Sequence, residues 1–225
     1  MFNSHFMNSD ICISVSGVEV YPSSTFHYLG VTLDHSLSFE PHVLEICRSS
    51  FAFLRSLYRI RSYLPYASVL SLVNAFVFSR LDYCNSVLSF CNNRTIGRLQ
   101  RVQNCLVRLI KFLPRRSPTS SAIRDIGWLR ANNRILYKIC CMTHKCIYGT
   151  LPFYVSNLIS PSLSVTSISL RSDSSCTLYT PIIRFAYVCR AFYYAAPRLW
   201  NSLPASLRCE PRYNVFKRKL KVHLL

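Results

Sequence analysis

Acidic residues and glycines are scarce in this sequence. It has 225 residues but only 9 Asp and Glu and only 5 Gly. So few glycines leave no glycine-rich loop of the kind that cradles phosphates in nucleotide-binding enzymes. The nearest cluster of acids, Asp34, Glu40 and Glu45, is better explained by helix capping or by pairing with Arg than by metal binding. We therefore expect no catalytic residues, no metal site and no cofactor in this chain.

Cysteine motifs and long apolar runs are also missing. The 11 Cys are odd in number and form no Cys-x-x-Cys pair, and the N-terminal MFNSHFMNSD is not a secretory signal. No stretch approaches the roughly 18 uninterrupted apolar residues that span a membrane. These absences predict an intracellular protein, in the nucleus or the cytoplasm, that is neither secreted nor membrane-bound and keeps its Cys reduced.

Cys140, Cys141, His144 and Cys146 are the best candidates for a zinc site. Zinc needs four ligands that converge as a tetrahedron, whereas these four lie close together on one expected helix and point around it. Core cysteines with one exposed histidine are therefore the favoured interpretation, and a zinc module is the alternative.

Positive charge, in contrast, is abundant. Lys and Arg number 27, giving a formal charge of +18, and 21 of the 27 are Arg. Like charges repel in a compact chain, so an anionic partner is expected, and a phosphate backbone supplies binding energy by releasing its counterions. The planar guanidinium binds phosphate bidentately and stacks on bases. The composition therefore predicts binding to nucleic acid rather than to a small-molecule substrate or a membrane; charge without function is the alternative.

The order of the patterns predicts a mainly α-helical protein with a small N-terminal β-meander. β-branched and aromatic runs (ICISV, VEVY and FHYLGVTLD) place the meander in residues 1–37. Helical periodicity fills residues 38–155. A Ser-rich linker is expected at 156–180, followed by a C-terminal helical and irregular region with a basic tail at 181–225.

Within residues 38–155 we expect four helices, at about 38–64, 65–90, 94–113 and 131–148. The second is apolar nearly all round, as in a buried helix. The third carries a row of Leu and Val roughly 110° from a row of Arg, and the first has three Arg within about 40° of one another. These rows and the basic tail are the expected phosphate contacts: Arg48, Arg55, Arg59, Arg94, Arg98, Arg101, Arg108, Lys217, Arg218, Lys219 and Lys221.

Asp82 and several large aromatic residues have structural interpretations. Asp82 lies beside Arg80 at the end of the expected buried helix, where a satisfied structural polar group is favoured over a catalytic acid. Packing in the core is favoured over base stacking for four aromatic residues. These are Trp128, Trp200, Tyr193 and Tyr194.

Eight segments carry a family resemblance. They are FHYLGVTLDHSLSFEPHV (26–43), SRLDYCNS (79–86), RLQRVQN (98–104), DIGWL (125–129), RILYKIC (134–140), LRSD (170–173), AFYYAAPRLWNSLP (191–204) and FKRKLKVHLL (216–225). In content and order they resemble the C-terminal part of the reverse transcriptase of non-LTR (LINE-type) retrotransposons, particularly the CR-type and jockey-like branch. The resemblance covers Phe26 to Leu225.

The resemblance implies a role for each region. Tyr28, Leu29, Gly30 and Val31 match the primer grip, and the helices over 40–113 match the thumb, which follows the template–primer backbone. The family's polymerase uses Mg²⁺ held by a Tyr-x-Asp-Asp motif in the palm. That motif does not occur in this chain, and the family places it upstream of residue 1. Nucleotidyl transfer requires such metal-holding carboxylates.

The expected function is therefore that of a non-catalytic fragment of an RNA-directed DNA polymerase. It would bind RNA or a template–primer duplex through its Arg-rich helix faces. The alternative is a structural or protein-interaction fragment that docks on the polymerase palm and has no activity of its own. A truncated copy of a mobile element would explain the missing motif.

Overall fold

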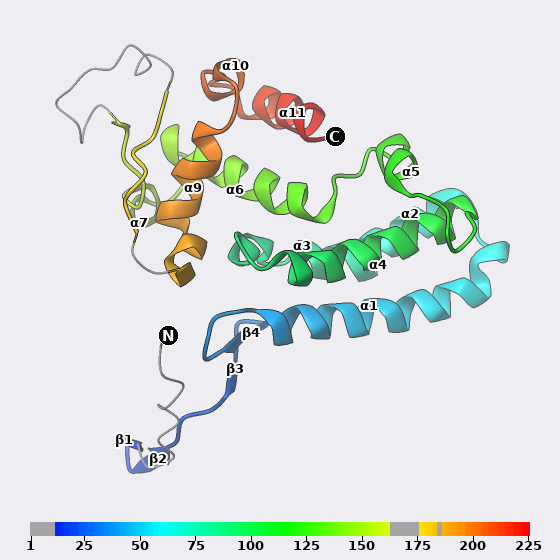
Figure 1. Ribbon diagram of the computed structural model, residues 1–225, viewed down its shortest axis with the longest axis horizontal. Helices are drawn as coiled ribbons and strands as arrows, with labels where there is room; N and C mark the ends of the chain where they lie inside the picture. Colours follow the sequence, from blue (N-terminus) through cyan, green and yellow to red (C-terminus); the bar gives the residue numbers. More distant parts are fainter. Residues whose placement is uncertain (1–11, 163–175, 184–185) are drawn as a thin grey trace.

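The computed structural model describes residues 12–162, 176–183 and 186–225, and within them the chain is mainly helical with short N-terminal antiparallel strands, as predicted (Figure 1). The strands are β1 (Ile13–Val15), β2 (Val18–Val20), β3 (Thr25–Tyr28) and β4 (Val31–Asp34). The longer helices are α1 (Glu40–Ile60), α2 (Tyr66–Val73), α4 (Asn93–Lys111), α6 (Ala131–Ile147), α9 (Phe192–Asn201) and α11 (Tyr213–Leu224). The shorter segments are η1 (Arg61–Tyr63), η2 (Asn74–Phe78), α3 (Ser79–Asp82), η3 (Asn85–Leu88), α5 (Ser120–Asp125), α7 (Phe153–Ser156), η4 (Ala186–Arg190) and α10 (Ala205–Arg208). Much of the expected Ser-rich linker, including LRSD at 170–173, lies outside the described residues.

The strands form two separate hairpins, so the prediction of one continuous β-meander is wrong. β1 pairs with β2 and β3 with β4, antiparallel in both cases, and no ladder joins the two hairpins within the described part of the chain. Pro22 stands between them and has no N–H to donate to a ladder, which explains why the pairing stops there. Of the four strands, β4 is the one that is largely buried, because it packs against α1.

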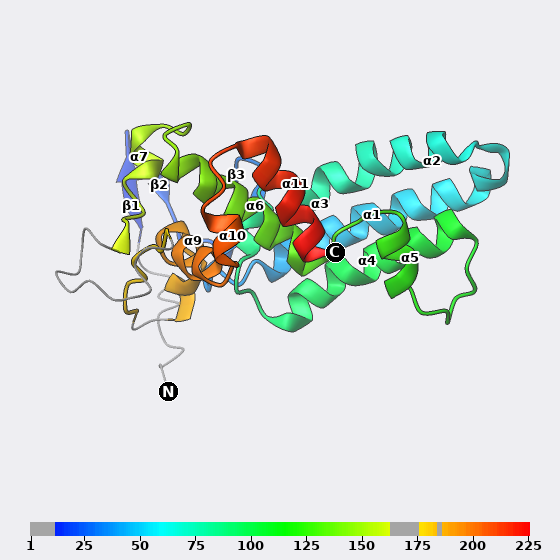
Figure 2. The same ribbon diagram turned by 90° about the horizontal axis from the view of Figure 1, so that it is seen from above.

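Helices α1, α2–α3 and α4 form a three-helix bundle (Figures 1 and 2). α1 and α4 run in the same direction, because Arg98 pairs with Glu40 near their starts and Arg61 donates to the Ile110 carbonyl near their ends. The chain runs back between these ends through α2, η2 and α3. Fully buried aliphatic residues at helical spacing build the core of this bundle: Val43, Leu57, Val69, Val73, Val77, Val102 and Leu106.

The second helix is shorter and more exposed than the sequence predicts. It ends at Asp82 and contains a π-helical turn, η2, in its middle. The wider turn keeps Val73, Val77 and Leu81 on the inner face. Phe76 is nevertheless 47% exposed and stacks on a ring of α1, so the prediction of a helix buried on all sides is wrong.

α6 lies between the bundle and the C-terminal helices. It contacts α4 on one side and α9 and α11 on the other (Figure 1). Trp200, Phe216 and Leu220 are fully buried on this second side and form a core of their own. The segment before α9 packs onto the same core, since the Trp200 indole donates to the Cys176 carbonyl at 2.9 Å. Among the described residues, no helix combines the length and the apolar character needed to cross a membrane.

The aromatic residues assigned to the core differ in their burial. Trp200 and Tyr194 are buried, as predicted. Trp128 is half-buried with its ring edge-on to Phe78, at 4.5 Å between centroids. Tyr193 is 37% exposed, so its assignment to the core is wrong.

Asp82 has a structural partner, as predicted, but the partner is not Arg80. The carboxylate accepts from Nε of Arg134 on α6 at 2.8 Å and from a second nitrogen of the same guanidinium. The Arg134 guanidinium also lies 4.2 Å from the ring centroid of Phe78. This pair therefore joins the end of the second helix to α6.

Candidate nucleic-acid interface

Two long stretches of the bundle contain no acidic residue. Residues 46–81 and 83–124 have neither Asp nor Glu, and the acids that border them are Glu45, Asp82 and Asp125. These stretches include α1 beyond its first turns and the whole of α4. Beyond Glu45 of α1, the positive charges of the two helices are therefore not balanced by acids from these stretches.

The predicted Arg row on α1 lies on the surface. Arg48, Arg55 and Arg59 are all exposed. At a rise of 1.5 Å per residue, the row extends over roughly 16 Å. The predicted row on α4 extends over roughly 21 Å, from Arg94 to Arg108. α1 and α4 pack against each other in parallel, so the two rows run in the same direction along the bundle.

A groove of about 670 Å³ lies on the surface between the second halves of the two helices. Its floor is apolar and is formed by Phe51, Leu54, Tyr58, Cys105, Leu109, Leu113 and Pro114. Three arginines line it as well: Arg55 from α1, Arg108 from α4 and Arg115 from the loop after α4. The structure thus brings together two predicted residues that are 53 positions apart in the sequence.

Arg115 was not among the predicted contacts, because it lies beyond the helical periodicity that revealed the others. Two signals in the sequence mark it. It belongs to the Arg115–Arg116 pair that directly follows Pro114 at the end of the helix, and it lies inside an acid-free stretch. The Arg108 side chain holds the following loop in place, since two of its nitrogens donate to the Ser117 carbonyl at 3.2 and 3.1 Å.

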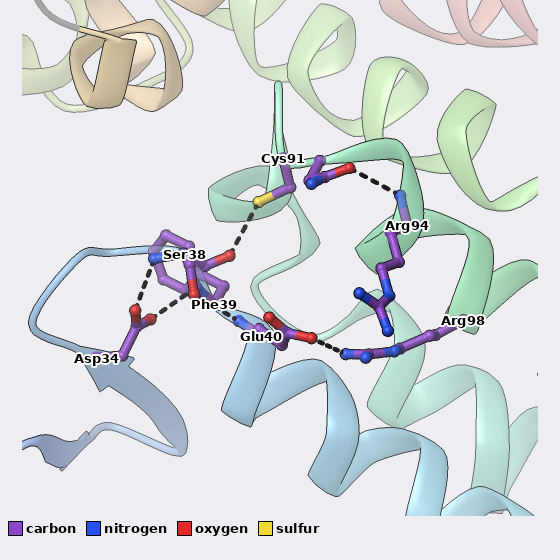
Figure 3. Close-up of polar contacts among 8 residues, drawn as sticks. Asp34, Ser38, Phe39, Glu40, Cys91, Arg94 and Arg98 are labelled. Carbon is purple, nitrogen blue, oxygen red and sulfur yellow. Dashed lines mark hydrogen bonds and ion pairs between the residues drawn. The ribbon is translucent and has the colours of Figure 1, made fainter. Parts of the chain in front are cut away.

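The start of the α4 row lies near the first turn of α1 and the segment 34–39 before it, which we call the entrance of the bundle (Figure 3). There the side chains of Arg94 and Arg98 both point toward Glu40, and Arg98 forms an ion pair with it. Burial raises the pKa of the Cys47 thiol, and the nearby charges of Arg98 and Arg101 oppose that rise. The Arg98 side chain is half-buried and its charge is partly neutralised by Glu40, whereas Arg94 and Arg101 are exposed.

The carboxylate of Asp34 shapes the same entrance. It accepts backbone N–H groups of Ser38 at 3.0 Å and Phe39 at 2.8 Å, just before α1 begins (Figure 3). Burial opposes its ionisation, but the hydroxyl of Ser36 and these backbone donors outweigh that effect and lower the pKa of Asp34 to about 2. Asp34 is thus a structural anion that positions the first turn of α1.

The primer-grip-like residues form the turn between β3 and β4. Leu29 and Gly30 have positive φ values of 46° and 78°, as in a tight type I′ hairpin turn, and Tyr28 pairs with Val31. The hydroxyl of Tyr83 donates to the Leu29 carbonyl at 2.7 Å, which ties the turn to the end of the second helix. A Cβ on Gly30 would lie 3.2 Å from the Tyr83 ring, so the residue is also constrained by this close approach.

The basic tail lies apart from the two Arg rows. α11 packs on α6, and α6 in turn separates it from α4 (Figures 1 and 2). Lys219 is paired with Glu210 at 2.7 Å, and the Lys217 ammonium lies 5.5 Å from the Tyr213 ring centroid. Arg218 and Lys221 are exposed. The structure therefore brings Arg55 of α1 and Arg108 of α4 to one groove and leaves the tail on another surface.

Three of the described carboxylates are held by groups of the chain itself rather than placed to bind Mg²⁺ as in a polymerase. Asp82 is held by a guanidinium, Asp34 by hydroxyl and N–H donors, and Glu210 by Lys219. Two-metal catalysis needs carboxylates that converge on the ions. In the described ranges no three His, Cys, Asp or Glu side chains are grouped closely enough to hold a metal ion.

The zinc candidates on α6 are part of the core. Cys140 is fully buried, and burial raises the pKa of its thiol, which disfavours the thiolate that binds zinc. His144 is only 1% exposed, so the prediction of an exposed histidine is wrong. Its Nε2 lies 2.9 Å from the Glu210 carbonyl, and its ring stacks on Phe216. A helix surface that looks free in the sequence is covered by a segment more than sixty residues later.

Comparison of the chain with protein-family models, curated proteins and solved structures gave no match. The likeness to LINE-type reverse transcriptases therefore stays a prediction from the order of the motifs.

Proposed function

We propose that this chain binds the phosphate backbone of RNA or of a template–primer duplex, without sequence readout and without catalysis. It would serve as the thumb-like segment of a LINE-type reverse transcriptase. The observation that carries the proposal is the groove between α1 and α4, where Arg55, Arg108 and Arg115 converge on a surface built from acid-free stretches.

The arrangement suits a polyanion better than a single small anion. Two packed helices lie about 8–10 Å apart, so their Arg rows present charge along two parallel lines rather than at one point. A nucleic-acid strand has one phosphate after another, and each neutralised phosphate releases condensed counterions. Contacts of this kind position a backbone and do not read base edges.

Salt dependence of binding tests this proposal. The affinity for an RNA–DNA duplex is measured by fluorescence anisotropy between 50 and 200 mM salt, with the logarithm of the affinity plotted against the logarithm of salt concentration. Each phosphate contact contributes a slope of about −0.7 to −0.9. The groove variant, with Arg55→Gln, Arg108→Gln and Arg115→Gln, is expected to reduce the steepness by about 2 to 3.

A matched control removes the same charge elsewhere. Arg80, Arg130 and Arg212 are exposed and do not line the groove, so the triple change of these residues to Gln is expected to alter the slope by much less. Equal effects of the two triple variants would show attraction by net charge alone. A flat salt dependence of the unchanged protein would refute the proposal.

A second candidate function is docking on a polymerase palm, and the hairpins favour it. Ile13, Val15, Val18 and Val20 of the first hairpin are all at least half exposed. Leu29, at the tip of the second, is 74% exposed. Apolar surface of this kind marks protein interaction sites. Co-expression with the palm of a LINE-type reverse transcriptase is expected to give a complex that co-elutes in size-exclusion chromatography. Separate elution of the two proteins would refute this function.

A further inference from the structure

The end of the bundle farthest from the hairpins carries exposed aromatic rings. We call it the distal end and define it as residues 55–66 and 108–116, which include the last turns of α1 and α4, η1 and the start of α2 (Figures 1 and 2). Tyr58 is 76% exposed, Tyr63 84% and Phe112 68%. Burial of a large aromatic ring away from water lowers the free energy of the protein, so a group of exposed rings calls for an explanation.

The distal end has four aromatic rings, because Tyr66 joins the three named above, and two of the four are held in place by cations. The guanidinium of Arg61 lies 4.2 Å from the ring centroid of Phe112, and Lys111 lies 5.9 Å from that of Tyr66. Arg61 is itself buried and donates to the carbonyls of Leu64 at 3.3 Å and Ile110 at 3.1 Å. Phe112 therefore rests on a fixed guanidinium and keeps its opposite face toward solvent.

The other two rings are free to receive a ligand. Among the described residues, neither Tyr58 nor Tyr63 has a ring partner, a cation over its face or a side-chain hydrogen bond. Tyr58 lines the groove between α1 and α4, so one of the free rings lies where the proposed backbone path reaches the distal end.

Positive charge surrounds these rings without a carboxylate from the same segments. The distal end contains seven basic residues and no Asp or Glu. They are Arg55, Arg59, Arg61, Arg108, Lys111, Arg115 and Arg116. This charge complements phosphate, whereas an apolar protein surface would offer these cations no anion to pair with.

We infer that the distal end binds unpaired nucleotides, so that a single-stranded extension of the nucleic acid stacks its bases on Tyr58, Tyr63 and Phe112. This inference rests on the proposed function, because the same strand would follow the groove. Bases inside a duplex have both faces covered by their neighbours, whereas unpaired bases can stack on aromatic side chains. Exposed rings interleaved with cations are the combination that single-strand binding uses.

The test compares three labelled oligonucleotides by fluorescence anisotropy at fixed salt. The first is a blunt RNA–DNA duplex, the second is the same duplex with a single-stranded extension, and the third has an extension of equal length made of abasic sugar phosphates. Stacking contributes on the order of 10-fold in affinity per base. The unchanged protein is expected to prefer the base-bearing extension over the abasic one by at least that factor.

The ring variant is Tyr58→Leu, Tyr63→Leu and Phe112→Leu, which keeps every charge and removes the stacking faces. It is expected to lose the preference for the base-bearing extension, while the salt slope of its binding to the blunt duplex stays unchanged because every charge is kept. A matched control changes three exposed rings elsewhere, Tyr21, Phe153 and Tyr154, to Leu and is expected to retain the preference. If the triple change lowers the melting temperature, the single variants of Tyr58 and Tyr63 carry the test.

The outcomes separate the two proposals. If the blunt duplex binds with steep salt dependence but the ring variant keeps the preference, or the unchanged protein has none, this inference is wrong and the proposed function stands. If the ring variant weakens all three oligonucleotides equally, the rings act through structure or through a protein-like surface, and the inference is again wrong. If no oligonucleotide binds at low salt, the proposed function fails and takes the inference with it.

Discussion

The distal end of the bundle and the C-terminal core use the same residue types in opposite ways. Both combine aromatic rings with cations. At the distal end the rings of Tyr58, Tyr63 and Phe112 are mostly exposed, and the cations have no acid in the same segments. In the C-terminal core, Trp200 and Phe216 are fully buried.

The C-terminal core also neutralises its charge. Lys219 pairs with Glu210, and the Glu210 carbonyl lies 2.9 Å from Nε2 of His144. The ring of His144 lies 4.5 Å from that of Phe216 and 4.4 Å from that of Tyr148. Rings in this region therefore pack against one another and stabilise the fold, whereas rings at the distal end are presented to solvent. Burial and the position of one acid, rather than composition, distinguish this structural cluster from the surface proposed to bind nucleotides.

The largest expected effect is the difference in stability between removing a buried ring from the C-terminal core and removing an exposed ring from the distal end. Phe216→Ala leaves a cavity in the C-terminal core and is expected to lower the free energy of unfolding by about 3–5 kcal/mol. Tyr58→Ala removes an exposed ring and is expected to change it by no more than about 0.5 kcal/mol. Urea denaturation followed by circular dichroism measures both. Similar losses of stability in the two variants would contradict the difference in burial between the two rings.

A smaller effect is expected at the entrance of the bundle, at acid pH. The pKa of Asp34 is about 2 in the folded chain, below its ordinary value, so its contribution is present above about pH 4 and is lost as the pH falls toward 2. Asp34→Asn is expected to cost about 2 kcal/mol at neutral pH and to converge with the unchanged protein near pH 2. Thermal melts across this range test it, with the exposed Asp125→Asn as control. Curves that stay parallel down to pH 2 would contradict the role of Asp34.

Next comes the difference between the Arg groove and the basic tail. The tail variant Lys217→Gln, Arg218→Gln and Lys219→Gln is expected to reduce the salt slope of duplex binding by only about 1, against about 2 to 3 for the groove variant. The reason is that Lys219 is already paired with Glu210 and Lys217 lies over the Tyr213 ring. Anisotropy titrations at four salt concentrations measure the slopes. A larger change in the tail variant would move the interface to α11.

The smallest effect is expected from the titration of His144. Burial lowers the pKa of this ring, and the Glu210 carbonyl and carboxylate only partly offset that effect. The unfolded chain therefore takes up the proton first, so stability is lost as the pH falls below about 6.5. His144→Phe is expected to flatten the dependence of unfolding free energy on pH between 7 and 5. Some dependence is expected to remain, because burial also lowers the pKa of His42. An unchanged slope would show that His144 does not titrate in this range.

Much of the helical fold could be predicted from local pattern. The apolar spacing predicts helices at 94–113 and 131–148, and the structure has α4 at Asn93–Lys111 and α6 at Ala131–Ile147. Strand runs in the sequence show where strands lie but not which strands pair, so the sequence predicts one meander where the structure has two hairpins. The π-helical turn in the second helix was also missed, since it depends on how Val73, Val77 and Leu81 fit the bundle core.

The candidate site was predictable in part for the same reason. Helical periodicity places Arg94, Arg101 and Arg108 on one face of α4, and the structure has them there. It does not show that α1 and α4 pack in parallel, and so it could not join Arg55 to Arg108 across a groove. Arg115 lies in a loop, where no periodicity operates.

By itself, the sequence determined the charge, the Arg rows and the acid-free stretches, because these depend only on residue identity and on the period of a helix. Only the tertiary structure decided which rings are buried and which are exposed. Tyr58 and Phe216 both lie in basic amphipathic helices, yet one is 76% exposed and the other fully buried. The difference comes from neighbours distant in the chain: α6 and the Trp200 helix cover Phe216, while the groove beside α4 leaves Tyr58 open. Burial is a property of non-local packing, and no local pattern contains it.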